Sequence, residues 1–139
     1  MLILSEKTNN MEYEELTSQI IKAAYNVHNT LGAGFLEKVY EKAMKIELKE
    51  MGLEVESQYP IPVYYHEQSV GDYNADLFVE ECIIVELKAV ENIHPLHEVQ
   101  LVNYLAGTGI DNGLLINFGS SVKVKRKFRN YKKETGFQD

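Results

Sequence analysis

The sequence has little of what marks a secreted or membrane protein. It contains a single cysteine, Cys82, so no disulfide can form within the chain, and we expect a reducing compartment. No apolar run approaches the ~18 residues needed to span a bilayer, and the first residues lack the layout of a signal peptide. We therefore predict a cytoplasmic protein with no membrane partner.

The sequence also lacks any segment with the composition of a linker between domains. The three prolines and nine glycines do not gather into a Pro/Gly/Ser-rich tract, and the chain has no internal repeat. With 139 residues, 45% of them hydrophobic, the chain is long enough for one real core. We predict a single domain over residues 1–139, with loosely ordered tails at about 1–11 and 132–139.

Positive charge is scarce. The chain has 14 Lys and Arg against 21 Asp and Glu, and its net charge of −7 argues against broad nonspecific binding to nucleic acid. Half of these bases nevertheless fall in the acid-free segment 123–133. They could bind nucleic-acid phosphates, or they could coat a solvated edge strand and prevent edge-to-edge pairing. The five bases that we call the basic strip are Lys123, Lys125, Arg126, Lys127 and Arg129.

The spacing of apolar residues predicts the order α-α-β-β-β-α-β-β, which is an α/β fold with a mixed sheet. Pro60 and Pro62 indicate that the first strand is irregular or lies at an edge. The helices are expected at residues 13–31, 36–51 and 95–106. The strands are expected at 55–65, 72–79, 83–90, 113–118 and 122–128, with a turn at 66–71.

Two charged residues, Glu86 and Lys88, interrupt the apolar run 82–90. Residues two apart on a strand share a face, so both side chains point to one side and Leu87 points to the other. Burying such charges is unfavourable unless they have partners. Asp76 on the preceding strand is the candidate partner, because two carboxylates and an ammonium can hold a divalent cation with a basic group beside it.

Whether the two carboxylates meet depends on the connection between their strands. A two-residue turn would pair Asp76 with Val85 and would put the carboxylates on opposite faces. A three-residue connection over residues 80–82, or a bulge, pairs Asp76 with Glu86 instead. We predict this second register, because carboxylates on opposite faces could not form a metal site.

Two helical segments add candidate residues. Glu37 follows Gly34 in the first turn of the second helix, where an acid can also merely complement the helix dipole. Gln100 and Tyr104 lie one above the other on the third helix, at a spacing that also suits an ordinary polar face.

Taken in order, these motifs resemble those of the PD-(D/E)XK nuclease superfamily, particularly its RecB-like branch. They are a glycine–glutamate helix, an aspartate strand, a Glu-x-Lys strand and a Gln-x-x-x-Tyr helix. Gly34-x-x-Glu37-x-x-Tyr40 further resembles the uncharacterised GxxExxY family of bacteria and archaea. The resemblance runs over about residues 13–131, and it departs from the superfamily name in having Ala75, not proline, before Asp76.

The resemblance implies a restriction-endonuclease-like α-β-β-β-α-β core, with a mixed central sheet flanked by helices. It implies hydrolysis of phosphodiester bonds in nucleic acid with Mg²⁺ or Mn²⁺, with DNA favoured over RNA. The cation would be held by Asp76, Glu86 and the carbonyl of Leu87, with Glu37 as direct or water-mediated support. Lys88 would orient or deprotonate the attacking water, and Gln100 and Tyr104 would position Lys88, the water or the phosphate.

Two alternatives stay open. The first is a catalytically silent nucleic-acid-binding or regulatory module with the same fold, which would need a protein partner. The second is a structural or interaction protein in which Glu86 and Lys88 form a half-buried ion pair, since such pairs are weak evidence of function. The sequence also leaves room for a homo-oligomer.

Overall fold

The computed structural model describes residues 10–129, with side chains from residue 13 onwards. The predicted tails lie outside the described residues, except that Asn10 and Met11 already belong to the first helix. The described elements follow the predicted order: α2 (Asn10–Leu31), α3 (Glu37–Glu50), β1 (Val55–Tyr65), β2 (Gln68–Val79), β3 (Ile83–Lys88), α4 (Pro95–Thr108), β4 (Asn112–Phe118) and β5 (Val122–Phe128).

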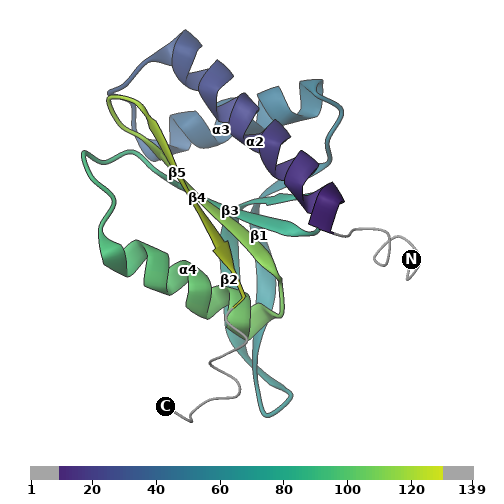
Figure 1. Ribbon diagram of the computed structural model, residues 1–139. Coiled ribbons are helices and arrows are strands. Elements are labelled where there is room, and N and C mark those ends of the chain that lie inside the picture. The colour runs from purple at the N-terminus through teal and green to yellow at the C-terminus, as the bar shows by residue number, and fades with distance from the viewer. Residues whose placement is uncertain (1–9, 130–139) are drawn as a thin grey trace.

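The strands form one mixed sheet in the order β1-β2-β3-β4-β5. Strands β3 and β4 are parallel, and the other neighbouring pairs are antiparallel. A parallel pair requires a crossover connection, and α4 supplies it. Helices α2 and α3 cover one face of the sheet and α4 covers the other (Figure 1). The predicted restriction-endonuclease-like α/β fold is confirmed.

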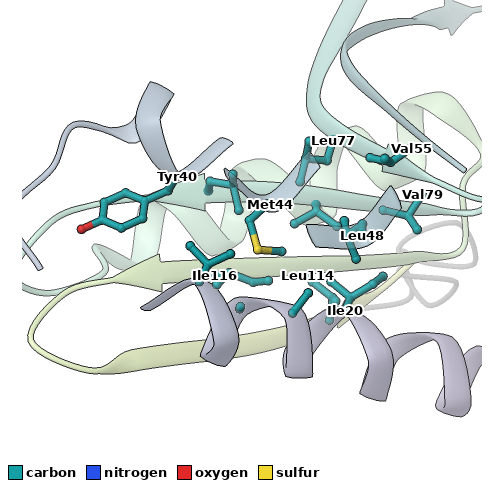
Figure 2. Close-up of a cluster of buried hydrophobic side chains, with 14 of the residues drawn as sticks. Ile20, Tyr40, Met44, Leu48, Val55, Leu77, Val79, Leu114 and Ile116 are labelled. Atoms are coloured by element: carbon teal, nitrogen blue, oxygen red, sulfur yellow. The ribbon is translucent and has the colours of Figure 1, made fainter. Parts of the chain in front are cut away.

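Each face of the sheet has its own hydrophobic core. Figure 2 shows the core under α2 and α3, in which Ile20, Met44 and Leu48 meet the side chains of the sheet. The core under α4 is formed by Leu101 and Leu105 against the opposite face. Successive residues of β3 alternate between the two cores: Ile83, Val85 and Leu87 face α2 and α3, and Ile84 faces α4. By the same alternation, the side chains of Glu86 and Lys88 lie on the same face of the sheet as that of Ile84, which is the face that α4 covers.

Tyr40 fixes the start of α3. Its side chain is fully buried, and its ring stacks on Phe118 with 4.4 Å between the ring centroids. Its hydroxyl donates a hydrogen bond of 2.6 Å to the carbonyl of Gly32 and accepts one of 3.3 Å from the backbone N–H of Phe35. These contacts hold the α2–α3 loop, and therefore also the position of Glu37 in the first turn of α3.

The turn predicted at residues 66–71 is shorter than expected. Only His66 and Glu67 form it, both with positive φ (51° and 65°), as in a two-residue hairpin of type I′. The next residues already pair with β1, for example Gly71 with Val63. The strand expected to reach residue 90 ends at Lys88. None of the helices within residues 10–129 combines the length and apolar character needed to cross a membrane.

Candidate active site

Strands β2 and β3 separate at Asp76. Their last backbone pair is Leu77 with Val85, whereas β3 remains paired with β4 as far as Lys88. The side chain of Asp76 spans this opening, where its Oδ2 accepts a hydrogen bond of 2.9 Å from the backbone N–H of Leu87. We call this place the β2–β3 fork. At this point the N–H of Leu87 is bonded to a side-chain carboxylate of β2 and not to a backbone carbonyl of that strand.

The connection that sets the register has the predicted length. Val79 pairs with Ile83, so three residues join the strands, and Glu80 and Glu81 take φ values of 53° and 54°. Continuing the register beyond Leu77 and Val85 sets Asp76 opposite Glu86. In addition, the backbone N–H of Asp76 donates a hydrogen bond to the Glu86 carboxylate. The backbone of Asp76 therefore lies beside the Glu86 carboxylate at the fork.

Glu86 carries the least satisfied carboxylate of the site. Its Oε2 is buried and has no hydrogen-bond partner among the described residues. Burial raises the pKa of Glu86 from 4.5 to about 7, and the negative charges of Glu37 and Glu41 add to this increase. The hydrogen bond from Asp76 and the charge of Lys88 oppose it. The carboxyl group is therefore partly protonated at neutral pH, and it lacks a positive partner.

Lys88 is half-buried and acts on its surroundings through its charge. Within residues 10–129 no ion pair joins it to Glu86, so the half-buried Glu86–Lys88 pair of the structural alternative is not formed. Burial lowers the pKa of His97, and the charges of Lys88 and His94 lower it further. The first turn of α4 therefore lies within electrostatic reach of Lys88.

Two residues at the fork were not predicted from the sequence. The side-chain amide of Gln58 donates hydrogen bonds to Asp76 Oδ1 at 3.1 Å and to Glu41 Oε1 at 3.0 Å. Glu41 is only 8% exposed, whereas Glu37, one helical turn earlier, is exposed. The four-residue spacing of these glutamates places them on one face of α3, a signal that could have identified Glu41. No sequence signal marks Gln58.

The other predicted residues lie at different distances from the fork. The charge of Glu37 acts on both Glu86 and His97. Gln100 is exposed on α4, and Tyr104 stacks on Tyr73 of β2 with 3.9 Å between the ring centroids. In the described part of the chain neither of these two side chains hydrogen-bonds to Lys88. The residues that the structure gathers at the fork are Asp76, Glu86, Leu87 and Lys88, with Glu37 nearby.

Comparison with known proteins identifies the family. The family model of the PD-(D/E)XK nuclease superfamily matches residues 14–130, a range that includes every element of the sheet and the whole fork. The chain belongs to this superfamily. Its members generally hydrolyse phosphodiester bonds, and they typically use divalent metals. No curated protein and no solved structure matched the chain.

Because PD-(D/E)XK nucleases typically use divalent metals, the residues of the β2–β3 fork were compared with the ligands that such a cation requires. No three His, Cys, Asp or Glu side chains of residues 10–129 form a ready metal site. Mg²⁺, however, is commonly bound through one or two carboxylates and keeps several waters. Asp76, Glu86 and the Leu87 carbonyl are hard oxygen donors, and the partnerless Oε2 of Glu86 is an acceptor that a cation would satisfy. These residues therefore fit such a cation.

Four bases of the basic strip lie on β5, an edge strand of the sheet, and Arg129 directly follows it. Lys123 and Lys125 are exposed. The other three bases form ion pairs with acids from distant parts of the chain: Arg126 with Glu14 at 3.1 Å, Lys127 with Glu98 at 2.6 Å, and Arg129 with Asp111 at 3.1 Å. Much of the positive charge of the strip is therefore offset within the protein.

Proposed function

We propose that this member of the PD-(D/E)XK superfamily is a nuclease that hydrolyses phosphodiester bonds of nucleic acid with Mg²⁺ or Mn²⁺. The observation that carries the proposal is a buried Glu86 oxygen without a hydrogen-bond partner, next to the backbone of Asp76, whose own carboxylate is held by Leu87. Buried polar groups without partners are rare in folded proteins, and they call for a functional explanation. A carboxyl group with a pKa near 7 in such a place is typical of a functional site.

Asp76, Glu86 and the Leu87 carbonyl would hold the cation, and Glu37 would support it directly or through water. When bound, the cation would polarise the phosphate and favour ionisation of a water. Asp76 is already oriented by the backbone N–H of Leu87, so its carboxylate needs little reorganisation before binding. Glu86 would contribute most as the ionised form, which an adjacent positive charge favours.

As an ammonium, Lys88 would orient the attacking water and offset negative charge in the transition state, and as a neutral amine it would accept a proton from that water. Since no described carboxylate forms an ion pair with Lys88, its ammonium remains available to a water or a phosphate. Gln100 and Tyr104 would position the substrate phosphate from α4, which packs over the same face of the sheet.

The proposed substrate is nucleic acid, with DNA favoured over RNA. Lys123 and Lys125 would contact phosphates first, and the three paired bases of the strip, Arg126, Lys127 and Arg129, would contribute where a phosphate replaces their acidic partner. The Gly34, Glu37 and Tyr40 pattern supports placement in the GxxExxY family of the RecB-like branch.

The proposal is tested by degradation of plasmid and single-stranded DNA with Mg²⁺ or Mn²⁺. We expect wild-type protein to cleave, and Lys88→Ala to lose turnover while keeping its affinity for DNA. The chain supplies a matched control, because the tripeptide Glu-Leu-Lys recurs at residues 47–49 in helix α3. Lys49→Ala removes the exposed lysine of that copy and should leave cleavage unchanged. Binding of DNA without cleavage in either metal would favour the silent module and contradict a nuclease.

A further inference from the structure

The backbone of Gln58 is unusual for its position in a strand. Gln58 has φ of 51°, in the left-handed region, although it lies in the middle of β1. The neighbouring backbone pairs are Ser57 with Leu77 and Tyr59 with Ala75, and Gln58 forms none with Asp76 between them. Residues other than glycine rarely adopt this conformation, and strain of this kind concentrates at functional sites.

The side chain of Gln58 makes two hydrogen bonds in this conformation. A primary amide has two N–H groups, and here both find an acceptor, since Nε2 donates to Asp76 Oδ1 at 3.1 Å and to Glu41 Oε1 at 3.0 Å. The other oxygen of Asp76 accepts from Leu87 N–H at 2.9 Å. Both oxygens of this carboxylate are therefore held in place by uncharged donors.

Uncharged donors suit a carboxylate that must also bind a cation. A lysine or arginine in this position would form an ion pair with Asp76 and would repel an incoming metal ion. An amide fixes the orientation of the carboxylate but adds no positive charge, and each carboxylate oxygen retains a second lone pair. The same amide also links Asp76 to the buried Glu41, whose negative charge would otherwise have fewer partners.

We propose that Gln58 is a positioning residue, which its strained backbone places between Asp76 and Glu41 so that Asp76 is oriented for a divalent cation. This inference rests on the proposed nuclease function, and it adds to that function a residue on a different strand. Partners that orient a metal ligand in this way typically contribute about 10- to 100-fold to metal affinity.

The decisive variant is Gln58→Gly in the full chain. Glycine accepts the left-handed backbone without strain, and this gain offsets much of the cost of the lost hydrogen bonds and of the freer unfolded chain, so the metal-free protein should fold and melt close to the wild-type temperature. The lost amide should weaken Mn²⁺ binding at least about tenfold, measured by calorimetry without DNA. The Mn²⁺ concentration for half-maximal cleavage should rise by a similar factor, and cleavage at saturating Mn²⁺ should recover to near the wild-type rate.

His66→Gly is the matched control, because His66 has the same φ of 51° but lies in the β1–β2 turn. It should relieve similar strain and leave Mn²⁺ affinity unchanged. Gln58→Asn is the second variant, because asparagine tolerates the left-handed region but is one methylene too short to reach both acids. We expect it to fold and to bind Mn²⁺ several-fold more weakly.

The outcomes separate the positioning role from the function itself. Wild-type Mn²⁺ affinity in both Gln58 variants would overturn the role of Gln58 and leave the nuclease proposal standing. A lower melting temperature of metal-free Gln58→Gly, without the loss of Mn²⁺ affinity, would show a merely structural role. No Mn²⁺ binding by the wild-type protein would overturn both proposals.

Discussion

Replacing Glu86 by glutamine should change how the stability of the protein depends on pH. The folded-state pKa of about 7 lies above the ordinary value of 4.5, because the carboxyl group is buried. As pH rises from 4.5 to 7, the unfolded chain releases this proton before the folded chain does. The ionisation of Glu86 therefore destabilises the wild-type fold progressively over this range, and the effect is constant above it.

The magnitude follows from the two pKa values. Their difference of about 2.5 corresponds to about 3 kcal/mol at about 1.36 kcal/mol per pKa unit. Since domains are typically stable by about 5–15 kcal/mol, this is a large fraction of the total. Glutamine has a similar shape and does not titrate. The stability of Glu86→Gln relative to wild type should therefore rise by about 3 kcal/mol between pH 4.5 and 8.

Urea denaturation of both proteins at several pH values, in the presence of a chelator, measures this difference. A constant effect of the substitution on packing cancels, because the prediction concerns only the change with pH. The control is Glu50→Gln at the end of α3, which makes the same substitution at an exposed carboxyl group. A difference between wild type and Glu86→Gln that stays the same from pH 4.5 to 8 would refute the burial of an unsatisfied carboxyl group at the fork.

Two further predictions follow from contacts at the fork and on β5. The carboxylate of Asp76 accepts hydrogen bonds from two donors, and Asp76→Asn leaves only one oxygen for them. The metal-free variant should therefore lose about 1–3 kcal/mol of stability, and its melting temperature should no longer respond to millimolar Mn²⁺. A preserved response to Mn²⁺ would contradict the metal site. Neutralising both Lys123 and Lys125 should weaken binding of duplex DNA and reduce the slope of log affinity against log salt by about 0.9 per lost contact. Cleavage at saturating DNA should survive, and unchanged affinity and slope would show that these lysines do not bind substrate.

The strand-borne part of the site could be predicted from the sequence because it depends on local geometry. Alternation on β3 sets Glu86 and Lys88 on one face, and the three-residue connection pairs Leu77 with Val85, a register that brings Asp76 level with Glu86 when it is continued by one residue. The helical copy of the same tripeptide behaves differently, since Glu47 accepts a hydrogen bond of 3.0 Å from Asn26 of α2. Here the period of the secondary structure, rather than the tripeptide itself, decided which copy lies at the fork.

The parts that could not be predicted depend on contacts between distant segments. Gln58 combines a left-handed backbone with hydrogen bonds to two acids from other elements, and neither composition nor spacing shows this. The basic strip has no acid nearby in the sequence, but its partners come from α2, α4 and the residue before β4. The start of β2 at Gln68 was missed because residues 68–72 are exposed on both faces, so they lack the alternation of a half-buried strand.

The short pairing between β2 and β3 has a mechanical consequence. Strand β2 pairs with β1 from Gln68 to Val79, except at Val70 and Asp76, but it pairs with β3 at only three residues. The β1–β2 hairpin extends well beyond the rest of the sheet (Figure 1). Asp76 and Glu86 therefore lie on two strands that no backbone pair joins at that point, and the link between these strands there depends on the side-chain bond from Leu87 to Asp76 and on the helices packed against both faces.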